Sequence, residues 1–218
     1  DKVVALFTSN DVGIDDPLAS AFAAVDDPSF DDVRAASAQA WRAIWERADV
    51  GIDGDRLSQK ILRLHIYHCF VTASPHTAAL DVGIPARGLH GEAYRGHIFW
   101  DELFILPLYG LHFPEIARAS LLYRYRRLDR ARAYAREHGY AGAMYPWQSG
   151  SDGREETPTV HLNPVSGEWG PDYSSLQRHV SLAVAFNTWE YYSVTHDTEF
   201  LRDYGAEMFV ELARFWAG

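Results

Sequence analysis

Two long segments without regular periodicity, residues 75–97 and 145–173, interrupt a chain whose apolar residues otherwise recur at helical spacing. Apolar residues three and four positions apart line one face of an α-helix. The pattern predicts helices within 30–74, within 103–139 and from about Ser174 onward. Helices joined alternately by short and long connections are typical of an array of helical hairpins, so we expect an all-α fold.

The long connections should lie together, because an array of hairpins gathers its long loops at one end. We therefore expect the loops at 88–102 and 145–173 to meet at one mouth. Long irregular segments in compact domains are usually functional. The mouth is the part of the chain where a site is most strongly indicated.

The two ends of the chain fit this array less well. Val3 to Phe7 is an apolar run that predicts one short strand over residues 3–8, yet a strand needs a partner. The run from Arg214 to Gly218 lies in the middle of a helical pattern. Both features lead us to expect a piece of a longer protein.

Composition narrows the possible functions. Of the 218 residues, 47% are hydrophobic, which is enough to bury a sizeable core, and the formal net charge is -10. An acidic chain has no general attraction to nucleic acid or to anionic lipid, so we expect neither as a partner. The sequence has no run of about 18 apolar residues that could cross a bilayer. The single cysteine, Cys69, fits a reducing compartment, and we expect a cytoplasmic protein.

Two pairs in the loops, Trp100-Asp101 and Trp147-Gln148, carry the chemistry that a sugar site needs. An indole face covers the apolar side of a pyranose ring, while carboxylates and amides bind its hydroxyl groups. The competing interpretation is that the tryptophans only bury area and that Asp101 caps the following helix. Two such pairs in one chain favour a binding site. Glycosidic cleavage needs carboxyl groups, but spacing selects no pair among the available acids Asp101, Glu102, Glu155, Glu156 and Asp172.

Other ionisable clusters are expected to be structural. His65 and His68 are not part of an HExxH arrangement, so we expect core or helix-surface histidines and no metal site. The helix that starts at Pro114 carries arginines that we expect to form a solvated face rather than a phosphate site, since no glycine-rich cradle accompanies them. These arginines are Arg124, Arg126, Arg127, Arg130, Arg132 and Arg136.

Five segments, in order along the chain, resemble a known family. They are Gly91-Glu92-Ala93-Tyr94-Arg95-Gly96-His97-Ile98-Phe99-Trp100-Asp101, Tyr123-Arg124-Tyr125, Gly139-Tyr140-Ala141-Gly142-Ala143, Pro146-Trp147-Gln148-Ser149 and Tyr204-Gly205-Ala206-Glu207. Together they resemble glycoside hydrolase family 65, which contains maltose, trehalose and kojibiose phosphorylases and some acid trehalases. The resemblance covers almost the whole chain.

The resemblance implies an order of domains. Residues 1–10 resemble the end of an N-terminal β-sandwich, and residues 11–74 resemble a linker with the first helices. Residues 75–218 resemble the N-terminal part of a catalytic (α/α)6 barrel of helical hairpins, which would be truncated. The implied fold is all-α, with one short N-terminal strand left from the sandwich.

The resemblance also implies site residues. Trp100 and Asp101 match the family motif that grips the non-reducing glucose of an α-linked substrate. Glu102 departs from the family pattern, in which a threonine separates the aspartate from the glutamate. No catalytic residue is expected in the chain, because the family's general acid, a glutamate, would lie beyond Gly218. The expected substrate-binding residues are Arg95, Trp100, Asp101, Glu102, Trp147, Gln148 and Glu155.

The implied function is that of a fragment of an inverting α-glucoside phosphorylase or hydrolase for a disaccharide of the trehalose, maltose or kojibiose type. Lacking the general acid and the phosphate-binding loop, the fragment alone is expected to be inactive. The full-length protein is expected to be a homodimer that uses no cofactor, with inorganic phosphate as co-substrate if it is a phosphorylase. The alternative, from another class, is a noncatalytic helical module that binds a carbohydrate or a protein.

Overall fold

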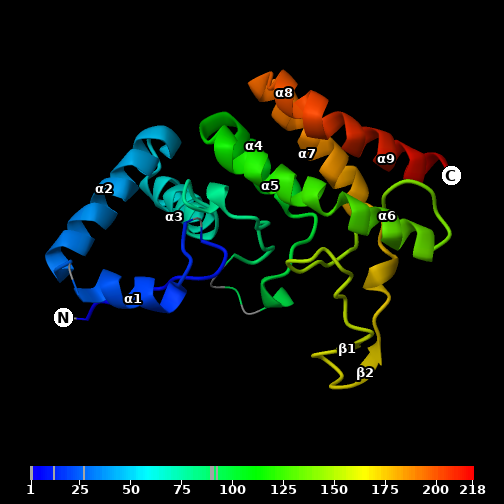
Figure 1. Ribbon diagram of the computed structural model, residues 1–218, viewed down its shortest axis with the longest axis horizontal. Helices are drawn as coiled ribbons and strands as arrows, with labels where there is room; N and C mark the ends of the chain where they lie inside the picture. The colour runs from blue at the N-terminus through cyan, green and yellow to red at the C-terminus, as the bar shows by residue number, and fades with distance from the viewer. Residues whose placement is uncertain (1, 12, 27, 89–90, 92) are drawn as a thin grey trace. The chain divides into compact units, whose positions relative to one another are not determined.

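Helices make up most of the described chain, as the apolar spacing predicts (Figure 1). Contacts divide the chain into two compact units, Asp1–His68 and Cys69–Gly218. Within the described ranges, no helix is long and apolar enough to cross a bilayer. Glu92, in the first family-like segment, lies outside the described part. The computed structural model describes residues 2–11, 13–26, 28–88, 91 and 93–218.

The first unit consists of helix α1 (Pro17–Asp26), helix α2 (Phe30–Ala48) and most of helix α3 (Arg56–Thr72). The start of α2 is fixed by a capping box, in which the Asp32 amide donates to Ser29 Oγ at 3.2 Å and the Ser29 amide donates back to the Asp32 carboxylate at 3.1 Å. The predicted helices over residues 30–74 are therefore present.

The strand predicted over residues 3–8 is wrong, because this segment has no regular secondary structure. Val4 and Leu6 are 73% and 85% exposed, so the run buries little area. A single strand leaves its backbone groups unpaired, and no described residue of this unit forms a ladder with it. Helix α1 was not predicted, because its alanine-rich sequence forms no clear apolar stripe.

The second unit is built around three helices that pack on one another, α4 (Glu102–His112), α5 (Pro114–Arg126) and α7 (Val180–Thr195). Figure 1 shows α4 and α5 in green beside α7 in orange. The remaining elements are the helices α6 (Leu128–Glu137), α8 (Thr198–Phe200) and α9 (Ala206–Ala217), the 3₁₀ turns Thr77–Ala79, Tyr94–Gly96 and Ser174–Leu176, the π-helical turn Leu201–Gly205, and the strands β1 (Val160–Leu162) and β2 (Trp169–Pro171).

The single helix predicted from Pro114 divides into α5 and α6 at Arg127, whose backbone has φ -105° and ψ 12°. The Arg127 side chain donates to Asp81 Oδ1 at 2.7 Å and, through Nε, to the Ser151 carbonyl at 2.8 Å. The expectation of a solvated arginine face is therefore wrong for Arg127, and it is also wrong for Arg124, which is 2% exposed. Both arginines contact the connections on either side of the helices instead of water.

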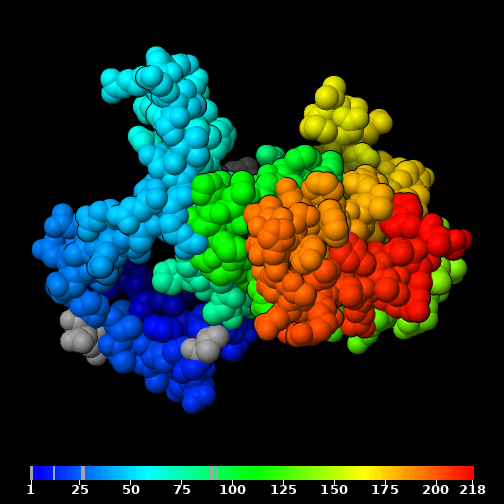
Figure 2. Space-filling view, turned by 90° about the horizontal axis from the view of Figure 1, so that it is seen from above, coloured from blue at the N-terminus to red at the C-terminus, as the bar shows by residue number. Residues whose placement is uncertain are grey.

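Strands β1 and β2 form an antiparallel hairpin within the segment 145–173, which was expected to be irregular throughout. Its turn runs from Asn163 to Gly167, where φ is +75°, a conformation that glycine adopts without strain. The hairpin projects from the rest of its unit in Figures 1 and 2, where it is yellow. Strands of three residues with no buried face give no alternating pattern, so the sequence does not reveal them.

Candidate functional site

The two long loops meet through backbone hydrogen bonds. Ile98 and Ser149 form an antiparallel bridge, in which the Ile98 amide donates to the Ser149 carbonyl at 2.8 Å and the Ser149 amide donates back at 3.0 Å. Ser149 also bridges to Glu155 within the second loop. The prediction that these loops meet is confirmed.

The bridge places Trp100 and Trp147 against one histidine. The His179 ring lies 4.9 Å from the Trp100 ring and 5.1 Å from the Trp147 ring, centroid to centroid, and it meets both edge to face. Phe99 contacts Trp147 at 5.3 Å. His179 is the residue directly before α7, so three separate segments contribute to one aromatic cluster. The sequence contains no local signal that connects His179 to either loop.

Asp101 lies directly before α4 but does not cap it. Its backbone is helical, with φ -60° and ψ -21°, and its side chain forms no capping hydrogen bond. Among the described residues, no side chain donates a hydrogen bond to its carboxylate. Burial raises the pKa of Asp101, its own backbone amide partly offsets the rise, and the charge of Glu102 adds to it. A half-buried carboxylate that accepts from no described side chain is suited to accept hydrogen bonds from a ligand hydroxyl.

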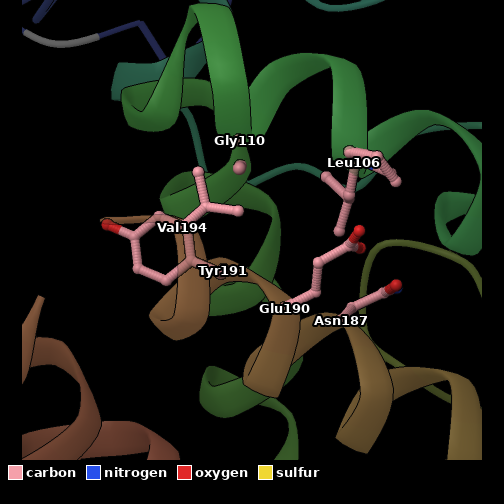
Figure 3. Close-up of a pocket in the computed structure, with 8 residues that line it drawn as sticks. Leu106, Gly110, Asn187, Glu190, Tyr191 and Val194 are labelled. Carbon is pink, nitrogen blue, oxygen red and sulfur yellow. The ribbon is translucent and has the colours of Figure 1, made fainter. Parts of the chain in front are cut away.

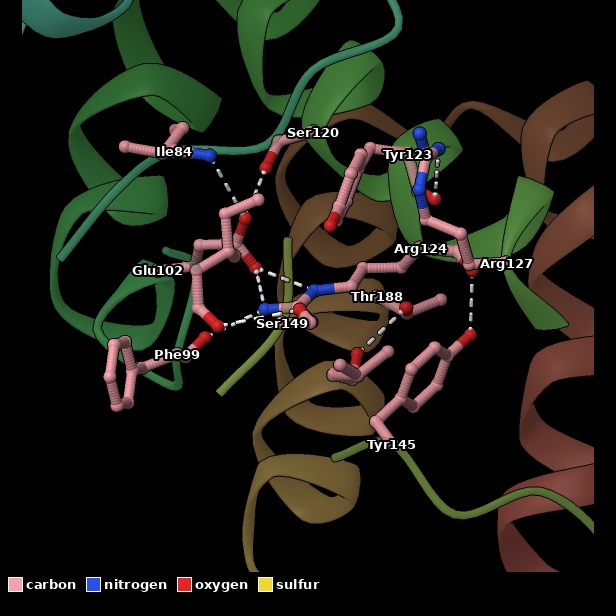
Figure 4. A network of polar contacts seen from close by, with 12 residues as sticks. Ile84, Phe99, Glu102, Ser120, Tyr123, Arg124, Arg127, Tyr145, Ser149 and Thr188 are labelled. Carbon is pink, nitrogen blue, oxygen red and sulfur yellow. Dashed lines mark hydrogen bonds and ion pairs between the residues drawn. The ribbon is translucent and has the colours of Figure 1, made fainter. Parts of the chain in front are cut away.

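Glu102, the next residue, is buried at 2% exposure (Figure 4). One carboxylate oxygen accepts from Ser120 Oγ at 2.9 Å and from the Ile84 amide at 3.4 Å. The other accepts from Arg124 Nε at 2.9 Å. The adjacent acids thus have opposite environments, and only Asp101 is accessible.

Glu155 is also occupied by internal donors. The Trp147 amide donates to one of its oxygens at 2.9 Å, and Tyr134 donates to the same oxygen at 3.2 Å. The amides of Gln148 and Thr157 donate to the other oxygen at 3.3 Å and 3.0 Å. The Glu155 carboxylate therefore holds the backbone of the Trp147-Gln148 pair.

Gln148 provides a second connection between the loops. Its side chain is almost fully buried, and its amide nitrogen lies 2.6 Å from His97 Nδ1, to which it donates. Arg95, two residues before His97, is exposed and left-handed at φ 53°. Its neighbour Tyr94 packs on Phe99 with ring centroids 4.8 Å apart.

The structure therefore sorts the seven predicted binding residues into three groups. Trp100 and Trp147 are partly exposed and contact His179, and Asp101, also partly exposed, follows Trp100 in the sequence. Glu102, Gln148 and Glu155 are engaged inside the protein. Among the described residues, Arg95 has no hydrogen bond or ring contact with either tryptophan. The described ranges also contain no group of three or more histidine, cysteine or acidic side chains placed to hold a metal ion.

A separate small void lies between α4 and α7, away from the two loops (Figure 3). Its volume is about 10 Å³, and Asn187 and Glu190 of α7 face it together with Leu106 of α4. Among the described residues, Asn187 Oδ1 and one Glu190 oxygen have no hydrogen-bond partner. Burial raises the pKa of Glu190. The void is too small for a sugar and belongs to the helix packing.

A mostly helical unit whose loops combine two indoles with an accessible carboxylate has the composition typical of carbohydrate-active proteins. The comparison with known proteins identifies the family. Residues 63–218 match the glycosyl hydrolase family 65 central catalytic domain, and the chain belongs to that family. The family resemblance inferred from the five segments is confirmed.

Individual relatives agree with this assignment. The chain is 49% identical over 219 residues to an uncharacterized glycosyl hydrolase of Mycobacterium tuberculosis, with 100% of the chain and 16% of that protein covered. It is 47% identical over 179 residues to the trehalose 6-phosphate phosphorylase of Lactococcus lactis, with 81% and 23% covered. A solved structure named as a kojibiose phosphorylase from the human microbiome superposes with a TM-score of 0.76 at 28% identity, covering 91% of this chain and 27% of that one. The chain thus spans about a quarter or less of the length of these proteins.

Proposed function

We propose that the chain is the glucose-binding part of a longer inverting α-glucoside phosphorylase or hydrolase, in which it forms part of an (α/α)6 barrel. Membership of family 65 and the names of its relatives support the reaction class. The observation that carries the proposal is the placing of Trp100 and Trp147 against His179, with the accessible carboxylate of Asp101 next to Trp100.

In this proposal, the Trp100 indole covers the apolar face of the non-reducing glucose, and Asp101 accepts hydrogen bonds from its hydroxyl groups. Trp147 bounds the same space from the second loop. Inversion requires a general acid for the leaving oxygen and a nucleophile on the opposite face of the ring. We assign neither to this chain, and we place both in other parts of the longer protein.

The nucleophile distinguishes the two reactions. Phosphate attacking the anomeric carbon releases glucose 1-phosphate, whereas water activated by a carboxylate releases glucose. Incubating a longer family 65 protein that contains this chain with trehalose, maltose or kojibiose, with and without inorganic phosphate, tells them apart. Binding without turnover under either condition would favour the alternative, a noncatalytic carbohydrate-binding module.

Substitution of the two central residues tests the site itself. Trp100→Ala should weaken glucoside binding roughly tenfold or more, because it removes the ring face that covers the sugar. Asp101→Asn should weaken it roughly fivefold to tenfold, because a hydrogen bond to a neutral amide oxygen contributes about 1 kcal/mol less than one to a carboxylate. Titration calorimetry of the 218-residue chain with the three disaccharides measures the loss. Trp216→Ala, which removes a half-exposed indole from α9, is the matched control and should bind normally. Unchanged affinity in both site variants would remove these residues from the site.

A further inference from the structure

One turn at the end of α5, residues 123–127, contacts both loops of the candidate site. For the second loop, Tyr123 donates through its hydroxyl to the Gly150 carbonyl at 2.5 Å, and the Tyr145 hydroxyl donates to the Arg124 carbonyl at 2.9 Å. For the first loop, Arg124 Nη2 donates to the Phe99 carbonyl at 2.6 Å. The turn thus connects the segments that carry the two tryptophans.

The Arg124 guanidinium binds Phe99 and Glu102 (Figure 4), the residues directly before and after the Trp100-Asp101 pair. Its Nη2 reaches the carbonyl of Phe99, the residue before the pair, while Nε and Nη2 both lie 2.9 Å from the carboxylate of Glu102, the residue after it. Nε and Nη2 converge on the same Glu102 oxygen, and simultaneous contacts from two nitrogens need the planar fork of arginine. The backbone on either side of Trp100-Asp101 is therefore fixed by one side chain.

The charge of Arg124 is compensated only by Glu102 among the described residues. Burial is the largest single effect and acts to lower the pKa of Arg124, but the Glu102 carboxylate together with Tyr123 and Tyr145 outweighs it, so the pKa lies above its ordinary value and the guanidinium stays charged. The rings of Tyr123 and Tyr145 lie 5.6 Å and 5.8 Å from the guanidinium carbon and exclude water around it. A buried ion pair of this kind can select one conformation of its surroundings even where it adds little net stability.

We propose that Arg124 is a positioning residue of the glucose site, and that Glu102 is its counter-ion and not a sugar ligand. Arg124 holds the Phe99–Glu102 backbone so that the Trp100 ring and the Asp101 carboxylate keep the geometry that the sugar requires. The inference rests on the proposed function for the nature of the ligand. The positioning of Trp100 itself can be measured without any ligand.

The first test uses Arg124→Lys, which keeps the charge but lacks the fork. We expect glucoside affinity to fall at least fivefold in the 218-residue chain, because the ammonium group cannot bind the Phe99 carbonyl and Glu102 in the same way. Arg132→Lys is the matched control, since Arg132 is also ion-paired but bonds to α9 and to neither loop. It should retain affinity within twofold. Equal affinities of the two variants would overturn the proposal.

A double-mutant cycle separates positioning from general loosening of the fold. Because Arg124 is proposed to act through Trp100 and Asp101, Arg124→Lys should cause a smaller fold-loss of affinity in a Trp100→Ala background than in the wild type, since only its effect through Asp101 remains. If Arg124 only stabilises the fold, the fold-losses of affinity from the two single substitutions should multiply in the double variant. Multiplying losses would therefore contradict the positioning role.

Fluorine NMR tests the positioning even if no glucoside binds. In chains labelled with 5-fluorotryptophan, Trp100→Phe and Trp147→Phe assign the two resonances. Arg124→Lys should shift or broaden the Trp100 resonance, and Arg132→Lys should not. If Arg124→Lys does not fold, Glu102→Gln keeps the shape, removes the counter-ion and should show the same shift. An unmoved Trp100 resonance in a folded variant overturns the proposal, whereas a moved resonance without glucoside binding refutes only the proposed function.

Discussion

The carboxylates around the candidate site differ in how many hydrogen bonds the protein itself supplies. Glu102 accepts from a hydroxyl, an amide and a guanidinium, and Glu155 accepts from backbone amides and a phenol. No described side chain donates to Asp101. Because a buried carboxylate needs its donors, removing them is costly, whereas an accessible one is available to a ligand.

Glycine at position 142 is required by two conditions at once. Its φ is +69°, and a Cβ atom there would lie 2.1 Å from the Glu211 carbonyl oxygen and 2.6 Å from the Phe215 amide nitrogen. Gly142→Ala should therefore lower the free energy of unfolding by about 3 kcal/mol or more. Urea denaturation measures it. Gly139→Ala, with φ +80° but no atom within 4 Å, should cost only about 1–2 kcal/mol, and equal losses would contradict the clash.

Glu190 provides a prediction about pH. Its pKa is raised by burial, so the charged form destabilises the folded state at neutral pH, and this penalty disappears as the pH falls below the unfolded value near 4.5. Glu190→Gln should therefore raise Tm at pH 7, by no more than about 2–4 °C because the carboxyl is partly exposed, with no gain near pH 4. Thermal unfolding of the wild type and of Glu190→Gln at pH 7 and pH 4 measures this difference in Tm. Glu168→Gln, an exposed acid in the hairpin, should not change Tm.

The chemistry of single residues was predictable to different extents. Trp100, Asp101 and Trp147 stand out in the sequence because aromatic and polar groups adjoin in loops. The internal roles of Glu102 and Glu155 depend on donors such as Arg124 and Tyr134, which lie more than 20 residues away along the chain. Sequence spacing contains no information about such distant partners. His179 was missed as part of the site for the same reason.

At the level of the elements, the sequence predicts that long amphipathic helices exist. It does not predict which side of α7 is buried or that the helix from Pro114 breaks at Arg127. Helix α7 is apolar on more than one side, so periodicity could not identify the buried side. Phe186 and Trp189 are large and apolar but 53% and 57% exposed, while the polar residues Asn187 and Thr188 are buried. The break at Arg127 depends on contacts with Asp81 and with the second loop, which local propensity does not encode.

Arg132 of α6 forms ion pairs with two glutamates of α9. Its guanidinium lies 2.6 Å from the Glu207 carboxylate and 3.1 Å from the Glu211 carboxylate. Hydrogen bonds from Arg132 hold the pKa of both glutamates below the ordinary value of 4.5. Arg132→Ala should lower stability by about 1–3 kcal/mol at pH 7, because Glu211 is left buried without this partner.

The sign of its pH dependence follows from the lowered pKa values. The stabilisation from the ion pairs of Arg132 is complete above pH 4.5 and is lost as the pH falls through the lowered pKa values of Glu207 and Glu211. The difference in Tm between wild type and Arg132→Ala should therefore shrink in acid, as calorimetric scans at pH 7 and pH 3 would show. A difference that grows in acid would exclude the ion-pair explanation.

At the scale of the second unit, α7 presents an uncovered apolar stripe. Leu182, Phe186 and Trp189 are each at least half exposed and lie at helical spacing. Such a surface favours association in water. The chain should therefore self-associate, and Phe186→Asp should shift it toward monomer in sedimentation velocity. Val165→Asp, at an exposed hairpin position outside the stripe, is the control. A wild-type monomer at high concentration would contradict this expectation.

The hairpin of β1 and β2 has a consequence for how the chain can be cut. Val165 in its turn is 95% exposed, and the residues of β1 bury no face. Opening this turn removes few contacts, so a protease should cleave here before it reaches the helices. Both products would remain held together through the packing of α4 and α5 on α7, which crosses the cut. The bonds of Arg124, Tyr123 and Glu155 lie within the N-terminal product and would keep its two loops in place. The second unit can therefore exist as two noncovalently associated chains.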